Sequence, residues 1–211
     1  MHRICPTRSR FPLCRTCFKQ RGHWCRPADS LVLPSGSCAD YRTRRRLGFA
    51  RDKSRCDTHR VMFHKTSFPN GMTPPGQLSH RPRYCNLRGD VRHWYPVPDD
   101  MSEALGALLD CFNARYDSCR DMYDLALFCT CAWLISHFLA LHPFADGNGR
   151  LAQILCSYVL AEHQPFPMPV CDAAHYLPSL LKAQSTGDID ALAACVAQSS
   201  CLAWKKLIDF L

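Results

Sequence analysis

Nine residues about two thirds of the way along the chain, HPFADGNGR, combine the side chains that a phosphate-transfer site needs. Gly147 and Gly149 remove side chains where a helix is expected to begin, so backbone amides there can close on an anion, helped by the helix dipole. Arg150 offers a planar, permanently charged guanidinium for phosphate oxygens. Asp146 is a hard oxygen ligand suited to Mg²⁺. His142 has an ordinary pKa that suits a general base near neutral pH.

The combination makes this signal specific. A glycine-rich loop by itself is weak evidence, and a single histidine at a helix end usually has a structural role. Here both occur together with an aspartate and an arginine within nine residues. The string therefore predicts a loop that binds phosphate groups and transfers them.

Two helices are expected to hold this loop. Residues 125–141 are apolar almost throughout. They fall short of the roughly 20 residues of a membrane span and run straight into a polar loop, so they predict the central helix of a bundle rather than a span. After the loop, apolar residues recur at the spacing of one helix face and end near Pro165. These residues are Leu151, Ile154, Leu155, Tyr158 and Val159.

The rest of residues 61–211 predicts further helices and one hairpin. Asp100 with Glu103 forms a capping box ahead of an apolar face, and Asp121 and Asp172 can cap two later helices. A break at Gly187-Asp188 separates the last two helices. Two short segments between residues 83 and 95 flank a glycine turn, whereas residues 61–80 are predicted to be a loop. The predicted fold class is an all-α helical bundle with a small β-hairpin.

The string resembles the signature of Fic proteins, HxFx(D/E)GNGRxxR, and the resemblance covers residues 61–211. Phe138 and Leu141 match the apolar positions ahead of the motif. The motif positions that match are His142, Phe144, Asp146, Gly147, Asn148, Gly149 and Arg150.

This resemblance implies a bundle that transfers AMP from ATP to a Ser, Thr or Tyr hydroxyl of a target protein. By position, His142 would deprotonate the hydroxyl and Asp146 would hold Mg²⁺. The amides of Gly147–Gly149, with Arg150, would bind the phosphates of ATP, and the phenylalanine of the motif would anchor the loop in the core. The hairpin at residues 83–95 would be a flap that aligns the target segment by strand addition.

The sequence departs from the family pattern at two points. The second arginine of the motif is replaced by Gln153, which can donate a hydrogen bond to phosphate but carries no charge. The inhibitory helix of the family needs a Ser or Thr four residues before a glutamate. Glu103 has Asp99 at that position and Glu162 has Tyr158, so this sequence encodes no inhibitory helix.

Two alternatives to AMP transfer remain open at this stage. The same scaffold can orient a nucleotide so that phosphate or another nucleotide group is transferred to protein. In the second alternative the chain is a weakened Fic fold that acts as a nucleotide-binding or interaction module. Gln153 favours that module, whereas His142 and Asp146 favour an enzyme.

Residues 1–60 differ in charge from the rest of the chain. They carry a net charge of +11, against −3 for residues 61–211, within a total of +8. They show no helix or strand periodicity, which predicts a basic extension of low order. Binding of nucleic acid is compatible with this extension, whereas nothing in the body indicates it. Two domains are expected: the extension, 1–60, and a Fic-like domain, 61–211.

The extension has two further interpretations. A zinc knuckle is one, because a two-residue gap between two cysteines lets both thiolates reach one ion. Its ligands would be Cys14, Cys17, His23 and Cys25. An organelle transit peptide is the other, since arginines are plentiful before the first acidic residue, Asp29. The fifteen cysteines are an odd number and no apolar signal segment precedes them, which favours a reducing intracellular compartment, the cytoplasm above all.

Overall fold

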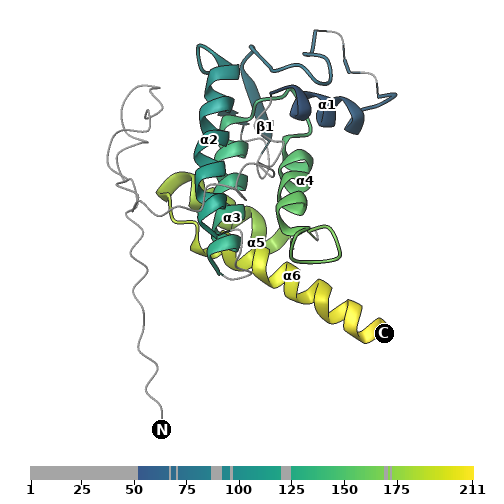
Figure 1. The fold of residues 1–211 in the computed structure, drawn as a ribbon. Coiled ribbons are helices and arrows are strands. Elements are labelled where there is room, and N and C mark those ends of the chain that lie inside the picture. The colour runs from purple at the N-terminus through teal and green to yellow at the C-terminus, as the bar shows by residue number, and fades with distance from the viewer. Residues whose placement is uncertain are drawn as a thin grey trace, which may run out of the picture. The chain divides into compact units, whose positions relative to one another are not determined.

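A computed structural model describes most of the chain from residue 52 onward (Figure 1). The described ranges are 52–66, 68–69, 71–86, 92–95, 97–119, 125–168, 171 and 173–211. The elements are α1 (Asp52–Met62), β1 (Arg83–Asn86), β2 (Arg92–Tyr95), α2 (Met101–Cys119), α3 (Leu125–Leu141), α4 (Asn148–Leu160), α5 (Ala173–Thr186) and α6 (Asp190–Phe210). The predicted helical bundle with one small hairpin is confirmed.

Some of the sequence predictions lie outside the described residues. They concern the zinc knuckle at Cys14, Cys17, His23 and Cys25, the hairpin turn at residues 88–90, and the caps at Asp121 and Asp172.

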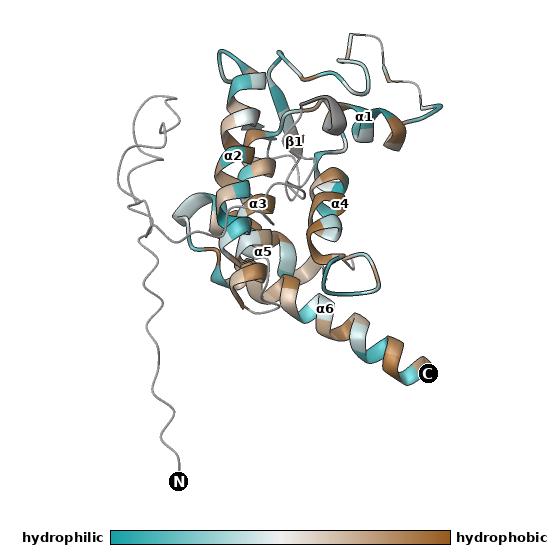
Figure 2. Ribbon diagram, viewed as in Figure 1, coloured by the Kyte–Doolittle hydropathy of each residue, from teal (hydrophilic) through white to brown (hydrophobic). Residues whose placement is uncertain are grey.

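Helix α3 forms the centre of the bundle. Its bounds are those predicted from the apolar run, and it packs against α2, α4, α5 and α6. Eleven of its seventeen residues are buried, and Figure 2 shows its strongly hydrophobic character. Among the described residues, none of the helices combines the length and the apolar composition that crossing a membrane requires.

Helix α2 begins at the predicted cap. The carboxylate of Asp100 accepts hydrogen bonds from the backbone N–H groups of Ser102, at 2.8 Å, and Glu103, at 3.0 Å. These bonds satisfy donors that the first turn of a helix leaves without partners. The predicted apolar face, which includes Leu105, Leu108 and Phe112, is buried against α3.

The break between α5 and α6 also lies where it was predicted. Gly187 adopts the left-handed conformation, with φ +76°, directly after the last residue of α5. The carboxylate of Asp188 accepts a hydrogen bond from the N–H of Asp190, the first residue of α6. This turn lets α6 pack against both α5 and α3.

The hairpin pairs β1 with β2 in antiparallel register, with Arg83 opposite Tyr95 and Tyr84 opposite Trp94. Side chains alternate between its two faces, as they must in a strand. Tyr84 and Trp94 are exposed on the outer face, whereas Arg83 is buried on the inner face. The inner face meets the loop after α3, because Arg83 donates a hydrogen bond to the carbonyl of Leu141 at 3.2 Å.

Helix α1 differs from the sequence prediction. Residues 52–60 were assigned to an extension of low order, yet they form most of this helix, which continues to Met62. Apart from Cys56, Val61 and Met62 the helix consists of polar residues, so the sequence offers few apolar positions from which to identify it. It is stabilised by a few residues at its end, His59 and Phe63, which are both buried.

Candidate active site

The residues predicted to carry chemistry lie in the segment that joins α3 to α4 and in the first two turns of α4. His142 directly follows the last residue of α3, and Asn148 is the first residue of α4. The residues that the structure brings to this segment are His142, Asp146, Gly147, Asn148, Gly149 and Arg150, with Gln153 one turn further along α4.

The imidazole of His142 is held in one orientation by its backbone. The residue has φ +51°, and its N–H still donates to the carbonyl of Phe138 at 2.9 Å. Its Nδ1 lies 3.4 Å from the carbonyl oxygen of Leu139. Because a carbonyl only accepts, the neutral ring carries its proton on Nδ1, which leaves the lone pair of Nε2 available as a base.

The surroundings of His142 favour its neutral form. Burial lowers its pKa to about 4, and the positive charge of Arg83 and the nearby His93 add to this effect. The contact with the carbonyl of Leu139 and the charge of Asp146 oppose it. Burial wins, since it disfavours the charged ring directly. The imidazole of His142 is therefore unprotonated at neutral pH.

The hairpin and the segment before it secure the start of the loop. Arg83 donates to the carbonyl of Ser79 at 2.8 Å as well as to that of Leu141. The N–H of Ser79 in turn donates to the carbonyl of Pro143 at 2.8 Å. On β2, the ring of Tyr95 stacks on the imidazole of His142, with ring centroids 3.8 Å apart.

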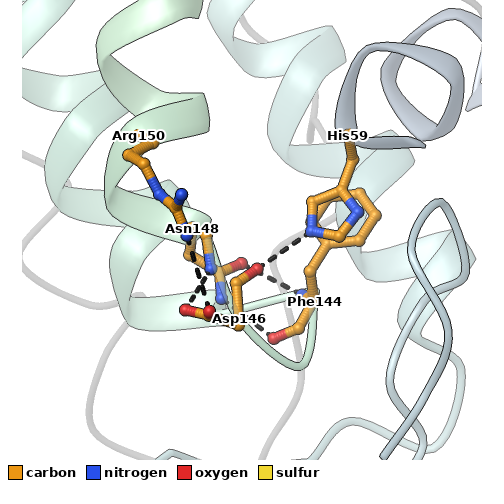
Figure 3. A network of polar contacts seen from close by, with 6 residues as sticks. His59, Phe144, Asp146, Asn148 and Arg150 are labelled. Carbon is orange, nitrogen blue, oxygen red and sulfur yellow. Dashed lines mark hydrogen bonds and ion pairs between the residues drawn. The ribbon is translucent and has the colours of Figure 1, made fainter. Parts of the chain in front are cut away.

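The side chain of Asn148 closes the loop from inside (Figure 3). Its carboxamide oxygen accepts from the N–H of Phe144 at 3.0 Å, and its NH₂ donates to the carbonyl of Phe144 at 2.9 Å. Both residues are buried, and Phe144 is fully so, as expected of an anchor in the core. Two hydrogen bonds to a single residue fix the distance between the loop and the start of α4.

Gly147 allows the loop to press against the end of α1. It has φ +75°, a conformation that residues with a Cβ adopt at a cost. A Cβ there would lie 2.5 Å from a ring carbon of Phe63 and 2.6 Å from the methyl group of Met62. Around Gly149, by contrast, an added Cβ would meet no atom within 4 Å. The first turn of α4 is therefore packed on one side and open on the other.

His59 connects α1 to the middle of the loop, as Figure 3 shows. Its Nδ1 accepts from the N–H of Gly76 at 2.8 Å, so Nε2 carries the proton and donates to the carbonyl of Asp146 at 2.9 Å. Its ring stacks on that of Phe144, with centroids 4.0 Å apart. Burial lowers the pKa of His59, outweighing its hydrogen bond to the Asp146 carbonyl. The neutral ring thus bonds the loop through Nε2 and the segment at Gly76 through Nδ1.

Asp146 and Arg150 are the charged groups at the open side of the loop. Their side chains are 59% and 58% exposed, and they form an ion pair with an N–O distance of 3.5 Å. The other carboxylate oxygen of Asp146 accepts from the N–H of Gly147 at 2.5 Å. The guanidinium of Arg150 also lies over the ring of Phe63, 4.6 Å from its centroid. Both charges are accessible to a ligand.

Sequence reasoning missed the residues that hold the loop from a distance. His59 and Phe63 precede the motif by about 80 residues, and Tyr95 and Arg83 belong to a hairpin whose inner face the sequence did not identify. The one available signal was the apolar run that follows His59, which is compatible with the end of a helix. The side-chain role of Asn148 was also missed, because only its amide was considered.

In this bundle the loop lies between the central helix and the next one, and a short hairpin contacts it. This is the architecture of a Fic domain. The sequence model of the Fic/DOC family matches residues 53–160, from α1 to the end of α4. A Fido domain-containing protein of Dictyostelium discoideum is 33% identical over 101 residues, which make up 45% of this chain and 71% of that protein. The chain belongs to the Fic/DOC family.

Another relative matches a longer part of this chain at lower identity. A ribonucleoside-diphosphate reductase small chain of Ostreid herpesvirus 1 is 25% identical over 138 residues, which are 63% of this chain but only 22% of that protein.

Two solved structures share the fold. A Fic domain-containing signalling protein of Bacteroides thetaiotaomicron has a TM-score of 0.56 at 21% identity, covering 72% of this chain and 61% of its own. A Fic family protein of Desulfovibrio desulfuricans has a TM-score of 0.51 at 18% identity, covering 74% and 48% respectively. The match thus spans less than two thirds of either solved chain.

Proposed function

We propose that this chain is a Mg²⁺-dependent protein adenylyltransferase, which transfers AMP from ATP to a hydroxyl group of a target protein. One observation carries the proposal: a neutral histidine with an available Nε2 lies in the same loop as an accessible carboxylate, an open helix N-terminus and an exposed arginine. Each of these groups has a part in moving a phosphoryl-linked group to a hydroxyl.

The open side of α4 suits the phosphates of ATP. The first N–H groups of any α-helix lack acceptors within the helix, and the helix dipole favours an anion there. The space beside Gly149 is free of protein atoms, and Arg150 can turn its exposed guanidinium toward phosphate oxygens. Gln153, one turn along α4, would add a neutral hydrogen bond to the same phosphates.

Asp146 is the residue that would hold Mg²⁺. Its carboxylate is more than half exposed and is engaged by Arg150 and the amide of Gly147, contacts that phosphate and metal ion can replace. A single carboxylate fits, because Mg²⁺ commonly takes one or two carboxylates together with substrate phosphates and water. When bound, the ion would neutralise charge that builds up on the phosphates.

In this reaction the hydroxyl oxygen of the target attacks the α-phosphorus of ATP and forms a new P–O bond. The bond from the α-phosphorus to the bridging oxygen breaks, and pyrophosphate leaves. His142 takes the hydroxyl proton on Nε2, the nitrogen that its contact with Leu139 leaves unprotonated. Arg150 and the amides of the first turn of α4 would stabilise the charge on the phosphates.

The hairpin would align the target. In the described part of the chain, β1 and β2 form a sheet of two strands only, so an extended segment can add to it through backbone hydrogen bonds. The inner face of the hairpin already touches the base through Tyr95. A segment bound to the hairpin would therefore lie within reach of His142.

Gln153 supports one competing function, a nucleotide-binding module without transfer, because a neutral side chain holds the outer phosphates less firmly than an arginine. Incubating the full chain with cell lysate and either α- or γ-labelled ATP distinguishes the candidates. Labelling of protein from the α position alone supports AMP transfer, and labelling from γ alone would assign phosphate transfer. Binding of ATP without labelling from either position would assign the module.

Replacing the base tests the same proposal more directly. We expect His142→Ala to lower transfer by about 10²–10⁴-fold, the usual contribution of a positioned general base. ATP binding should stay close to wild type, since His142 has no proposed contact with the phosphates, whereas the unfolding transition should fall modestly because Tyr95 loses its stacking partner. Labelling above a tenth of the wild-type rate would remove His142 from the mechanism.

A further inference from the structure

The ring of Tyr95 on the hairpin stacks directly on the imidazole of His142. Tyr95 is the last residue of β2, and its ring is nearly parallel to the imidazole of His142, at an interplanar angle of 11° and a centroid distance of 3.8 Å. At that separation the two rings are in van der Waals contact over a whole face.

Neighbouring residues of the hairpin fix the ring of Tyr95. Its hydroxyl lies 3.1 Å from the Sγ of Cys85 on β1, and the ring of His93 meets it edge-on at 4.9 Å. Burial and the contact with Cys85 raise the pKa of Tyr95, so its hydroxyl stays protonated at neutral pH. Tyr95 thus places an uncharged aromatic ring, called the aromatic plate below, against the imidazole.

Stacking covers one face of the imidazole and leaves its edge open. The lone pair of Nε2 lies in the plane of the ring, so a target hydroxyl can still approach it from the side. The ring of Tyr95 keeps water away from one face of the imidazole. This loss of hydration disfavours the charged, protonated form of His142.

We propose that Tyr95 is a positioning residue, which holds the imidazole of His142 in place and shields it from water, so that the hairpin both receives the target and keeps the base ready. Its bearing on transfer rests on the proposed function. Its effect on the protonation of His142 does not.

Other groups around His142 also influence its charge. Arg83 on β1 and His93 on β2 disfavour the imidazolium, whereas Asp146 in the loop and the carbonyl of Leu139 on α3 favour it. An aromatic face can also attract a cation. The pKa of His142 nevertheless falls to about 4 because burial is the largest influence, and Tyr95 supplies part of that burial.

Substitutions at Tyr95 separate the ring from its hydroxyl. Tyr95→Leu and Tyr95→Gln remove the aromatic plate in two chemically different ways. Tyr95→Phe keeps the plate and loses only the contact with Cys85, so it is the matched control. Far-UV circular dichroism identifies which of the two ringless variants keeps the helical fold, and that variant is used.

The first measurement follows the ring protons of His142 by NMR at pH 5.5 in the full chain without nucleotide, with His142→Ala to assign the signal. We expect a neutral imidazole in wild type and in Tyr95→Phe. In the ringless variant, the pKa of the imidazole should rise toward its ordinary value of about 6.5, so that a clearly larger fraction is protonated at pH 5.5 than in wild type. An imidazole that remains neutral in the ringless variant, or becomes protonated in Tyr95→Phe, would overturn the proposal.

The second measurement is the rate of AMP transfer at pH 7.5 and pH 5.5. Wild type and Tyr95→Phe should change little between these values through His142. The ringless variant should lose transfer at pH 5.5 in proportion to the imidazole that becomes protonated, by at most about tenfold. If wild type transfers no AMP while the NMR difference holds, the proposed function fails and the role of Tyr95 stands. If wild type transfers AMP and the NMR difference is absent, the proposed function stands and the role of Tyr95 fails.

Discussion

Single residues of the loop divide between those that face a ligand and those that hold the loop. Asn148 belongs to the second group, although its place between two glycines led the sequence analysis to count only its backbone. Its carboxamide is buried and is committed to both polar groups of Phe144. Asp146 and Arg150 belong to the first group, because their charged side chains are exposed where a ligand can reach them.

We expect Asn148→Ala to lower the free energy of unfolding by about 1–3 kcal/mol, because it leaves the buried N–H and C=O of Phe144 without their partners. Asn148→Asp keeps an acceptor for that N–H but places a buried carboxylate oxygen against the carbonyl of Phe144, so it should destabilise as well. Urea denaturation measures both. Asn113→Ala, on a partly exposed part of α2, is the control and should change stability little. Equal effects at positions 113 and 148 would contradict the structural role of Asn148.

Gln153 offers a gain of function at the residue scale. Residues three apart share a helix face, so Gln153 and Arg150 should point toward the same phosphates. We expect Gln153→Arg to strengthen ATP binding by about 1–2 kcal/mol, or roughly five- to thirtyfold in Kd, through a charge-assisted contact. Isothermal titration with Mg²⁺-ATP measures this change.

The control for Gln153→Arg is Tyr158→Arg, which adds the same charge at an exposed position of α4. Because Tyr158 lies about 140° further around α4 and about 7.5 Å further from its N-terminus than Gln153, its arginine should have a weaker effect. Neither of the chain's glutamates fits the family's inhibitory pattern, so we expect neither to pair with the new arginine at position 153. Glu162 already accepts a hydrogen bond from the hydroxyl of Tyr116. If both arginine variants bind ATP equally well, Gln153 does not face the phosphates.

At the scale of elements, the sequence predicted what depends on neighbouring residues. The apolar run of α3, the cap of α2 and the turn after α5 are local patterns, and the structure confirms each of them. Helix α1 was missed because what stabilises it is not local. Its contacts are with Phe144, Asp146 and Gly147, more than 80 residues away, and no neighbouring residue in the sequence indicates these partners.

Because the loop contacts the end of α1, Gly147 and Gly149 should differ in how well they tolerate a side chain. In Gly147→Ala, the new methyl group would meet the ring of Phe63 in a left-handed backbone conformation. We expect a loss of at least about 2 kcal/mol in the free energy of unfolding. Gly149→Ala, in open space within α4, should be neutral or stabilise by up to about 1 kcal/mol. Chemical denaturation followed by circular dichroism compares them, and similar losses would rule out the α1 contact as the cause.

At the scale of the whole molecule, buried neutral histidines make stability depend on pH. Burial lowers the pKa of His59, His137 and His142 in the folded state, so the unfolded chain binds protons more readily than the folded one. Their contribution to stability is complete above pH 6.5, the ordinary histidine value, and is lost progressively as the pH falls below it.

We therefore expect the urea midpoint to be constant between pH 8 and 7.5 and to fall between pH 6.5 and 5.5. Each neutral histidine can contribute at most about 1.4 kcal/mol per pH unit to this slope. His142→Gln should make the slope shallower by removing one titrating group, whereas wild-type stability that rises toward pH 5.5 would contradict the burial argument.

The central position of α3 has a consequence for how the protein is made. Its apolar surface is covered by α2, which precedes it, but also by α4, α5 and α6, which follow it in the chain. A nascent chain that has left the ribosome as far as α3 cannot yet cover this helix. Until α6 is synthesised, the growing polypeptide exposes the kind of surface that chaperones bind and that promotes aggregation. Synthesis that stops at Gly187 should thus yield an insoluble product rather than a smaller working domain.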